Sequence, residues 1–443
     1  MTRAASSQVG RPPAFSYRES RKGLFRRASQ QILCADAVPL TTLADRYGTP
    51  LYVYSASTIR ERIRIFERAF RGVPHTVCYS VKANSNLSIL RLLRHLGCGF
   101  DVVSGGELQR VVAVDRKAAR DVVFSGVGKT SDEMLLALKA GILMFNVESE
   151  SELWRLAECA ARLRKTARIA LRVNPDVSAQ THPYISTGLH QHKFGIPIEQ
   201  ARKLYASASG TRHLRVSGVS VHIGSQITDP APFGEAMERV ADLVRQLRED
   251  RHKIEFVDAG GGLGISYEGS TLDDFSERAN HYASSLLRPL RGLKLHLVLE
   301  PGRTIIGPAG LLLTSVVCLK QNDGKHFVVT DAAMNDLLRP ALYGAHHEIV
   351  PVKHNSTSQT RKVDIVGPIC ETGDFLARDR DLPEVSEGEL LAILDTGAYG
   401  MALGSNYNSR PKAAEVLVDG KSVRLIRRRE SFNDLIRQES IQN

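Results

Sequence analysis

A lysine stands at the end of a short apolar segment that is typical of a β-strand. The segment runs from His75 to Ala83 and contains the β-branched residues Val77 and Val81, and Lys82 is its only charged group besides the histidine. Strand interiors favour Val, Ile and aromatic residues, whereas lysine is seldom buried. Partial desolvation at a strand end lowers the pKa of an amine, so that some of it is neutral and nucleophilic. Lys82 is therefore a candidate Schiff-base lysine, and a solvated strand-end lysine is the alternative.

Two later segments have residue types that could bind a phosphate. Asp258 is followed by Ala-Gly-Gly-Gly-Leu-Gly, and Glu300 begins the string Glu-Pro-Gly-Arg. Glycines tolerate positive φ and leave their N–H groups bare, so their backbone can close around a phosphate. A sharp turn would also explain the glycines alone. The candidate cofactor-binding residues in these segments are Gly261, Gly262, Glu300, Pro301, Gly302 and Arg303.

Eight β-rich segments alternate with helical patterns around these residues. The segments are His75–Ala83, Phe100–Ser104, Asp121–Gly126, Met144–Glu148, Arg168–Asn174, Val216–Gly224, Phe256–Gly262 and Leu295–Arg303. The helices expected between them are Ser88–Leu96, Gly106–Val114, Ser131–Ala140, Ser149–Ala161, Ile198–Ala206, Pro232–Asp250 and Asp273–Leu290. This pattern predicts an α/β fold of the (β/α)8 TIM-barrel type, ahead of a doubly wound open sheet.

A barrel would bring the lysine and both loops to one end. Active sites of such barrels lie at the carboxyl ends of the strands, and phosphate is often held after strands seven and eight. A phosphate-bearing cofactor that reacts with an amine is pyridoxal 5′-phosphate, which also needs a ring-stacking partner and a group that tunes its ring nitrogen. His222 is the stacking candidate, with a structural histidine as the alternative, and Ser225 could donate to the phosphate. Glu300 is the best partner for the ring nitrogen, because a carboxylate there keeps it protonated. Three more charged residues fall at strand ends: Asp101, Glu107 and Arg172. Of these, Arg172 is expected to orient a neighbouring carboxylate.

After Arg303 strand-like segments continue without long helices, which predicts a separate C-terminal β-domain of sandwich or barrel type. The strand Leu51–Tyr54 precedes the barrel and is expected to join this β-domain. We therefore divide the chain into a basic disordered tail (1–35), a segment joining the β-domain (36–58), the barrel (59–305), the β-domain (306–420) and a basic C-terminal tail (421–443).

The net charge of +11 lies mainly at the two ends of the chain. Residues 1–35 carry seven Arg and Lys against Glu19, and residues 421–443 carry six against three acidic residues. The body is close to neutral, so no nucleic-acid partner is expected. The Arg- and Ser-rich N-terminus also resembles an organellar transit peptide, although a disordered tail is the favoured interpretation.

The remaining composition predicts a cytoplasmic protein without a membrane partner. No segment has the roughly 18 apolar residues needed to span a bilayer, and the N-terminus lacks the apolar core of a secretion signal. The six cysteines are scattered, with no Cys-x-x-Cys pair. A reducing compartment fits this spacing best, and no metal site is expected.

Several short strings occur in a family-specific order. They are Tyr-Ser-Val-Lys-Ala-Asn (79–84), Arg-Val-Asn-Pro (172–175), Ile-Ser-Thr-Gly (185–188), Lys-Phe-Gly (193–195), His-Ile-Gly-Ser-Gln (222–226), Gly-Gly-Gly-Leu-Gly (260–264), Glu-Pro-Gly-Arg (300–303), Asp-Ala-Ala-Met-Asn-Asp-Leu-Leu-Arg-Pro (331–340), Cys-Glu-Thr-Gly-Asp (370–374) and Gly-Ala-Tyr-Gly (397–400). Together they resemble the fold-type III pyridoxal-5′-phosphate decarboxylases, and within these the diaminopimelate decarboxylase family. The resemblance runs from about Val38 to about Pro411 and leaves out both basic ends.

This resemblance implies a carboxy-lyase that converts meso-2,6-diaminopimelate to L-lysine and CO2, the last step of lysine biosynthesis. It implies that Lys82 forms the Schiff base, that His222 stacks on the ring, and that Cys370 donates a proton to the carbanion. It also implies a homodimer with shared sites, in which the opposite subunit supplies the Cys-Glu string. Arginine forks can hold the distal carboxylate and a glutamate the distal ammonium group of this substrate. The implied substrate-binding residues are Arg303, Arg339, Tyr343, Glu371 and Tyr399, the last of which also binds the cofactor.

Other functions on the same fold are the alternatives. A decarboxylase for ornithine, arginine or carboxynorspermidine is the nearest, but ornithine lacks the distal carboxylate that Arg303 and Arg339 would bind. A racemase on the same barrel is a weaker alternative. A silent regulatory relative would be expected to lack Lys82 or Cys370, and a pyridoxal carrier would need only the barrel.

Overall fold

The chain divides into two units, each assembled from stretches that are separate in the sequence. The computed structural model describes residues 14–19, 31–177, 193–267, 272–354 and 359–441. The barrel unit comprises Arg62–Ile265 and Phe275–Thr304, and the β-unit comprises Met1–Glu61, Ser266–Asp274 and Ile305–Asn443. The string 185–188 lies outside the described residues.

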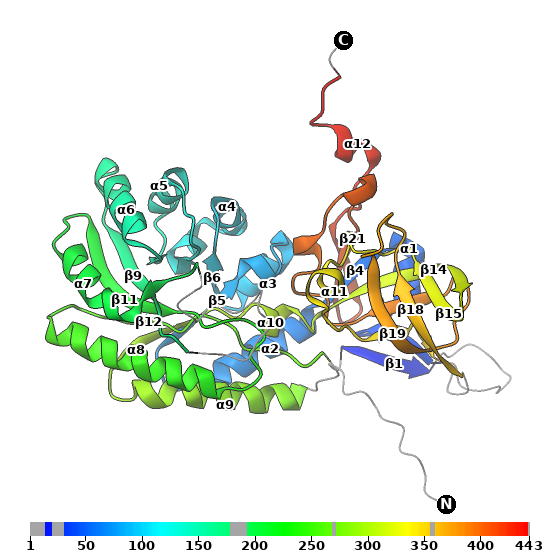
Figure 1. Ribbon diagram of the computed structural model, residues 1–443, viewed down its shortest axis with the longest axis horizontal. Coiled ribbons are helices and arrows are strands. Elements are labelled where there is room, and N and C mark those ends of the chain that lie inside the picture. Colours follow the sequence, from blue (N-terminus) through cyan, green and yellow to red (C-terminus); the bar gives the residue numbers. More distant parts are fainter. Residues whose placement is uncertain (1–13, 20–30, 178–192, 268–271, 355–358, 442–443) are drawn as a thin grey trace, which may run out of the picture. The chain divides into compact units, whose positions relative to one another are not determined.

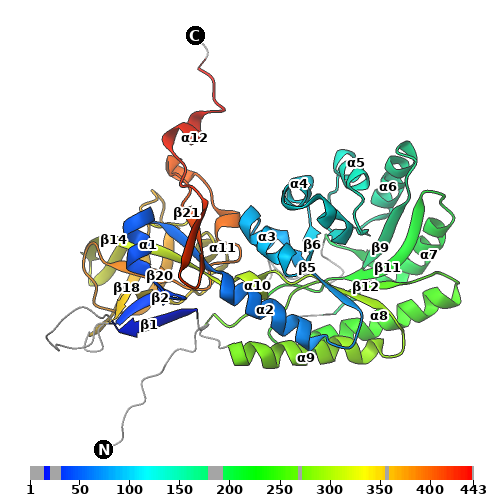
Figure 2. The same ribbon diagram turned by 180° about the vertical axis from the view of Figure 1, so that it is seen from behind.

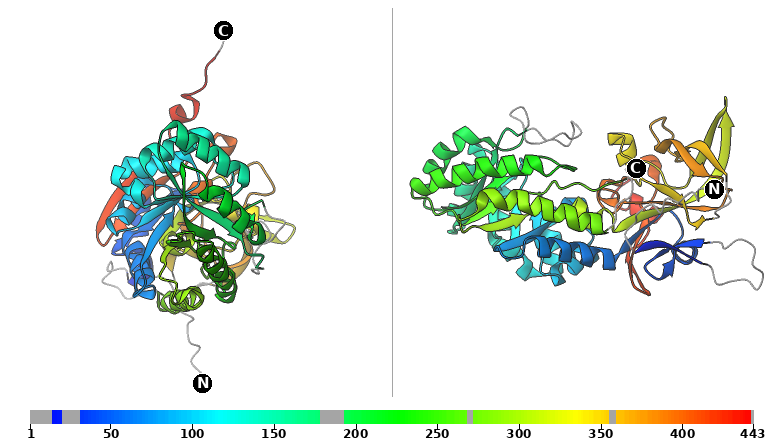
Figure 3. Two further views of the ribbon diagram at one scale, coloured as in Figure 1. Left: turned by 90° about the vertical axis from the view of Figure 1, so that its left-hand side faces the viewer. Right: turned by 90° about the horizontal axis from the view of Figure 1, so that it is seen from below.

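Eight parallel strands close into a ring in the barrel unit, which confirms the predicted barrel (Figures 1 and 3). Each strand pairs with the next, and the last pairs with the first. The strands are β5 (His75–Ser80), β6 (Gly99–Val102), β7 (Val122–Phe124), β8 (Met144–Val147), β9 (Ala167–Asn174), β11 (Leu214–Val221), β12 (Phe256–Asp258) and β13 (His296–Leu299). A short strand β10 (Ile196–Pro197) adds to β9.

Helices follow the strands and surround the ring (Figure 3). They are α3 (Leu87–His95), α4 (Gly105–Val114), α5 (Ser131–Ala140), α6 (Glu150–Arg162), α7 (Ile198–Ser209), α8 (Ala231–Glu249) and α9 (Leu272–Leu290), with α2 (Ala56–Ala69) before β5. Helices α4, α5 and α6 begin alike, because the hydroxyl of Ser104, Thr130 or Ser149 accepts a bond from the N–H three residues later. Such caps satisfy backbone donors that a helix start leaves open. Glutamates at that third position are thereby placed next to the carboxyl ends of the strands.

The β-unit contains a nine-stranded sheet that mixes early and late parts of the chain. Strand β4 (Leu51–Ser55) pairs antiparallel with β14 (Gly310–Asn322) and parallel with β21 (Ala414–Asp419), which confirms that an N-terminal strand joins this unit (Figure 1; Figure 2 shows the same unit from behind). Alternating side chains of these strands, such as Val53, Leu313 and Val416, form its buried core. Each buried Val or Leu contributes about 1.5–3 kcal/mol. The other strands of this sheet are β15 (Lys325–Thr330), β16 (Ile349–Pro351), β18 (Thr360–Val366), β19 (Phe375–Pro383), β20 (Leu390–Ile393) and β22 (Ser422–Arg427).

The two basic ends differ from the predicted tails. Strand β1 (Phe15–Glu19) pairs antiparallel with β2 (Gln31–Ala35), which also pairs with β3 (Val38–Pro39) and β17 (Lys353–His354). Phe15 and Leu33 are buried in the core of the β-unit, so apolar residues here outweigh the high charge of the segment. At the other end β22 pairs with β21, and a helix α12 (Phe432–Ile436) follows.

Seven of the eight predicted barrel strands extend too far at their carboxyl ends, and the fifth ends at Asn174 as predicted. The first ends at Ser80 rather than Ala83, and the last at Leu299 rather than Arg303. Lys82 therefore lies in a 3-10 turn, Val81–Ala83, directly after its strand. A glycine, a proline or a charged residue follows within three residues of each strand, where the chain leaves the sheet to form a loop. Among the described helices, none is long and apolar enough to cross a membrane.

Candidate active site

The lysine is tied to a buried carboxylate at the start of the barrel. Lys82 Nζ lies 2.5 Å from Asp101 Oδ2 and 3.3 Å from Ser80 Oγ, and its side chain is 35% exposed. Ser80 Oγ donates to Asp101 Oδ2 at 2.8 Å and lies 3.0 Å from the carbonyl oxygen of Glu300. The sequence predicts a partly neutral amine, whereas an adjacent carboxylate favours the charged ammonium form. Ser80 and Asp101 thus fix the position of the amine beside Glu300.

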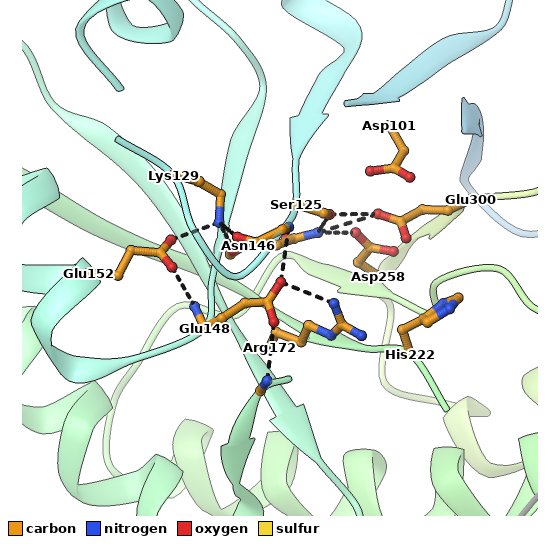
Figure 4. Close-up of polar contacts among 12 residues, drawn as sticks. Asp101, Ser125, Lys129, Asn146, Glu148, Glu152, Arg172, His222, Asp258 and Glu300 are labelled. Atoms are coloured by element: carbon orange, nitrogen blue, oxygen red, sulfur yellow. Dashed lines mark hydrogen bonds and ion pairs between the residues drawn. The ribbon is translucent and has the colours of Figure 1, made fainter. Parts of the chain in front are cut away.

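Glu300 belongs to a buried polar cluster drawn from four strand ends (Figure 4). Ser125 Oγ lies 3.1 Å from Glu300 Oε1, and Asn146 Nδ2 donates to Asp258 Oδ2 at 2.6 Å. Burial, followed by the charges of Asp101 and Asp258, raises the pKa of Glu300 well above its ordinary value. Burial also raises the pKa of Asp258 to about 6. Burial and the neighbouring carboxylates therefore favour the protonated form of Glu300.

His222 has a defined tautomer in the structure. The N–H of Gly261 donates to His222 Nδ1 at 3.1 Å, so Nδ1 is an acceptor and carries no proton. Burial, followed by the nearby cations of Arg172 and Lys82, lowers the pKa of His222 well below its ordinary value. The imidazole of His222 is therefore neutral and is held by the glycine loop. Such a ring can stack on an aromatic cofactor without adding positive charge.

The glycine loop after β12 is packed too closely for larger residues. A Cβ on Gly261 would collide with the carbonyl oxygen of Glu300, and one on Gly262 with that of Gly224. Gly262 also has a φ of +109°, which L-residues rarely adopt. In the same unit Arg303 Nη2 lies 3.3 Å from Ser225 Oγ. A guanidinium and a hydroxyl at this spacing suit a phosphate.

Arg172 orients a neighbouring carboxylate, which the sequence predicts without naming it. Its Nη1 lies 3.0 Å from Glu148 Oε1, and that oxygen also accepts from the N–H of Gly126 at 2.9 Å (Figure 4). The other oxygen of Glu148 accepts from the N–H of Gly195 at 3.1 Å. Glu148 thus joins the loops after three neighbouring strands, and Arg172 is held at the edge of the site.

A buried ion pair between Lys129 and Glu152, next to Glu148, was not predicted from the sequence. Lys129 Nζ donates to Glu152 Oε1, to the carbonyl of Gly126 and to the carbonyl of Asn146, each at 2.7 Å (Figure 4). Both side chains of the pair are fully buried. Lys129 therefore ties together the two strand ends that carry Ser125 and Asn146. Neither residue directly follows a barrel strand, so the sequence offers no signal that marks this pair.

Glu107, whose role the sequence leaves open, accepts the N–H of Val103 at 2.8 Å. Burial, with a smaller effect of Asp101, raises its pKa to about 7. It stands at the third position of α4, where the Ser104 cap fixes it. A carboxyl with this pKa changes its charge near neutral pH, close to the lysine and its partner Asp101.

The predicted substrate residues of the β-unit differ among themselves in exposure. Arg339 is the first residue of α11 (Arg339–Tyr343) and is only 5% exposed. Tyr343, at the other end of this helix, and Tyr399 are half-buried. Tyr399 has a φ of +57°, an unusual conformation for a bulky residue that is often found at functional sites.

Cys370 and Glu371 lie on an exposed loop of the β-unit. Asp374 fixes this loop, because its carboxylate accepts hydrogen bonds from the N–H groups of Ile369 and Met334, both at 2.7 Å. The N–H of Cys370 itself donates to Asn408 Oδ1 at 2.9 Å. A rigid backbone therefore presents a thiol and a carboxylate to the outside of this unit.

The donor set of the barrel fits pyridoxal 5′-phosphate. Asp101, Asp258 and Glu300 place three buried carboxyl groups around a single lysine. A protonated ring nitrogen against Glu300 would offset this surplus of negative charge. The tight glycine loop and the Arg303–Ser225 pair supply donors for the phosphate, and the lysine supplies the amine. The structure thus gathers Lys82, Glu300, His222 and the glycine loop in one unit.

Comparison with known proteins identifies the same family. The model of the family described as "Pyridoxal-dependent decarboxylase, pyridoxal binding domain" matches residues 56–307. The diaminopimelate decarboxylase of Pseudomonas aeruginosa is 50% identical over 427 residues, which are 96% of this chain and 99% of that protein. The crystal structure of diaminopimelate decarboxylase from Helicobacter pylori complexed with L-lysine has a TM-score of 0.85 and 42% identity, covering 90% of this chain and 99% of that one. The enzyme from M. jannaschii in co-complex with L-lysine has a TM-score of 0.87 and 38% identity, covering 97% and 99%. On these grounds the chain belongs to the diaminopimelate decarboxylase family of pyridoxal-dependent decarboxylases.

Proposed function

We propose that this chain removes CO2 from the D-centre of meso-2,6-diaminopimelate and releases L-lysine, the last step of lysine biosynthesis. The observation that carries the proposal is the cluster of Lys82, Asp101 and Glu300 at the carboxyl end of one closed barrel. It combines an amine with a carboxyl group for the ring nitrogen, the two groups that a pyridoxal-dependent reaction needs. The substrate follows from family membership and from Arg339 in the β-unit.

When bound, pyridoxal 5′-phosphate supplies an electron sink for the bond that breaks. Lys82 would hold the cofactor through its amine, which Ser80 and Asp101 keep in place. Glu300 would stand against the ring nitrogen, where its carboxylate would stabilise a positive charge. His222, held neutral by Gly261, stacks on the ring. The phosphate is bound by Ser225, the glycines Gly261 and Gly262, the Pro301–Gly302 turn and Arg303.

The substrate is held at its distal end so that only one centre reacts. Arg303 and Arg339 bind the distal carboxylate, Glu371 binds the distal ammonium group, and Tyr343 and Tyr399 donate further hydrogen bonds. Fixing the distal end orients the scissile bond of the D-centre toward the electron sink. Cleavage of that carbon–carbon bond releases CO2, and its electron pair would be taken up by the electron sink. The Cys370 thiol then protonates the carbon, and its thiolate regains a proton from solvent.

We also propose a homodimer in which each subunit offers its Cys370 loop to the barrel of the other. The exposure of Cys370 and Glu371 supports this arrangement, because a proton donor must be shielded from water during the reaction. Mixing inactive Lys82→Ala and Cys370→Ala proteins under exchange should restore about a quarter of the activity, since half of the dimers then hold one intact site. No restored activity despite demonstrated subunit exchange would place the thiol and the lysine in the same subunit.

We place the enzyme in the cytoplasm. All six cysteines lie in the described part of the chain, and all are free thiols. Reduced cysteines are typical of that compartment. Fractionation of the source cells followed by an activity assay would test this placement, and activity confined to an exported or organellar fraction would contradict it.

One assay tests the reaction itself. Purified protein is mixed with pyridoxal 5′-phosphate and, separately, meso-diaminopimelate, ornithine, arginine, lysine and carboxynorspermidine, and both CO2 and amine product are measured. We expect CO2 and L-lysine in equal amounts from diaminopimelate alone. Faster release from an amino acid without a distal carboxylate would overturn the substrate, and racemised diaminopimelate without CO2 would overturn the reaction.

A further inference from the structure

The buried histidine His347 is hydrogen-bonded to Arg339, the first residue of α11. Arg339 Nη1 donates to His347 Nε2 at 2.7 Å, and His347 is fully buried. The ring of Tyr267 packs against both partners. The guanidinium carbon of Arg339 lies 4.8 Å from its centroid, and the imidazole of His347 meets it edge to face at 5.1 Å. All three residues belong to the β-unit.

The contacts of His347 determine its tautomer. A guanidinium has only donors, so Nε2 must be a bare acceptor. The proton is then on Nδ1, which donates to the carbonyl of Leu394 at 2.8 Å. Both ring nitrogens are thus used, and the imidazole is neutral. A protonated ring would have donors on both nitrogens and could not accept from Arg339.

A neutral partner has a specific advantage for an arginine that binds a carboxylate. An aspartate or glutamate at this position would neutralise the guanidinium and compete with the carboxylate of the substrate. A histidine that only accepts a hydrogen bond fixes the guanidinium plane and leaves its positive charge available. The long side chain is ordered before the substrate arrives, so less conformational entropy is lost on binding.

We propose that His347 is a positioning residue for substrate recognition, which holds Arg339 in the orientation that binds the distal carboxylate. This inference rests on the proposed function in one respect, the assignment of Arg339 to that carboxylate. It predicts that His347 affects ligands that carry the distal carboxylate and leaves those without it unaffected. L-lysine retains this carboxylate after the D-centre has lost CO2, whereas 1,5-diaminopentane has none.

The test uses two replacements that separate the bonds of His347. In His347→Asn the amide can still donate to Leu394 but is too short to accept from Arg339, and in His347→Gln the amide oxygen reaches the position of Nε2. The neighbouring His346 provides a matched control, because it is exposed and also accepts from an arginine, Arg380, at 3.0 Å. His346→Asn and His346→Gln are made alongside. All proteins are compared as the cofactor-loaded enzyme.

Two measurements are made on each protein. Calorimetry gives the affinity for L-lysine and for 1,5-diaminopentane, and steady-state kinetics gives KM and kcat for diaminopimelate. For His347→Asn we expect about tenfold weaker lysine binding and a KM raised by about as much, with kcat within about twofold, because the lost interaction is uniform between ground and transition states. Diamine affinity and the absorption spectrum of the cofactor should not change. His347→Gln should recover most of the lysine affinity, and both His346 variants should match the wild type.

The outcomes that would overturn the inference are equally specific. Equal losses of lysine and diamine affinity in His347→Asn would mean a general structural role, and unchanged lysine affinity would mean that His347 does not act through Arg339. A His347→Gln protein that binds L-lysine as weakly as His347→Asn would also contradict the inference. This comparison of affinities holds even if one of the two variants is less stable. Failure of the wild-type enzyme to form lysine from diaminopimelate would instead overturn the proposed function, whereas the lysine and diamine affinities would still test His347.

Discussion

The barrel unit and the β-unit hold their charged residues in opposite ways. In the barrel, Lys82, Asp101, Asp258 and Glu300 are connected by direct or shared hydrogen bonds, and the three carboxyl groups are buried. In the β-unit, Cys370 and Glu371 are exposed, and the buried Arg339 is held by a neutral histidine. The charged groups of the barrel cluster are bonded mainly to one another. In the β-unit, Arg339 and Glu371 each offer one charge, and Cys370 offers one proton.

This difference matches two separate tasks. Chemistry on a cofactor requires groups whose proton positions are set in advance, which a buried and connected cluster provides. Recognition of a substrate requires charges that are left available for the ligand. We therefore expect changes in the barrel to alter the cofactor and kcat together, and changes in the β-unit to leave the spectrum of the bound cofactor intact.

Lys82→Ala should have the largest effect, because it removes the attachment of the cofactor. Activity is expected to fall by about 10⁴-fold or more. The visible absorption band of the attached cofactor should disappear, and the melting temperature of the apoprotein should fall as well, because the buried Asp101 loses its cationic partner. Lys253→Ala, which removes a lysine that is 82% exposed on the same unit, serves as the control. Full turnover with an unchanged band would refute the role of Lys82.

Glu300→Gln should be the next most damaging change. Glutamine retains the size of the side chain but cannot become an anion beside the ring nitrogen, so kcat is expected to fall by about 10²- to 10³-fold. The pH dependence of the cofactor spectrum should also change, since the ring nitrogen loses its counter-ion. Glu235→Gln on the surface of α8 is the control. If kcat changes less than twofold, the ring nitrogen has another partner.

Cys370→Ala provides the corresponding test in the β-unit. We expect kcat to fall by about 10²-fold through the loss of an acid catalyst. Because Cys370 is exposed, the free energy of unfolding should change by less than about 0.5 kcal/mol. Cofactor affinity and spectrum should not change, which distinguishes this variant from Glu300→Gln. Cys318→Ala, a half-buried cysteine elsewhere in the same unit, should behave as the wild type.

The smallest predicted effect is on the pH dependence of stability. Burial raises the pKa of Asp336, in the β-unit, to about 7. The folded protein thus keeps a proton there between about pH 4 and pH 7 that the unfolded chain releases. Its stabilising effect is full below pH 4 and declines as the pH rises to 7, by up to about 1.4 kcal/mol per pH unit. Denaturant titrations should show that Asp336→Asn reduces the slope by this share, whereas the share of Glu107, whose pKa is raised to the same value, remains. A slope identical to that of the wild type would contradict the assignment.

Much of the fold follows from periodicity in the sequence. The eight barrel strands and the seven helices after them were predicted within a few residues at their amino ends, because apolar alternation and helix caps are local patterns. The carboxyl ends of seven strands were predicted too late, whereas that of β9 at Asn174 was correct. At these ends the chain leaves the sheet in glycines and charged residues, such as those after Asp258 and Leu299, and periodicity does not describe them. The ends of the strands are also where the site lies.

The composition of the site was predicted better than its connections. Lys82, Glu300, His222 and the glycine loop do lie in one barrel, but the partner of the lysine, Asp101, had no assigned role. Lys129 and Glu152 were missed because each looks like an ordinary surface residue in the sequence. Only the fold reveals that a helix start and a loop after β7 bury both of them. Charge at the N-terminus likewise concealed the apolar residues Phe15 and Leu33, which pack in the core.

The position of β4 between β14 and β21 has a consequence for the order of folding during synthesis. All strands of the barrel have been made once Leu299 has left the ribosome, whereas β4 must wait for Asp419. We expect the barrel to close first while β4 remains without its second neighbour. Chains that end after residue 310 and have been released from the ribosome should therefore resist protease across the barrel and be cut near Leu51–Ser55. The sheet of the β-unit is thus completed late, because β4 and β21 pair only when synthesis of the chain is almost finished.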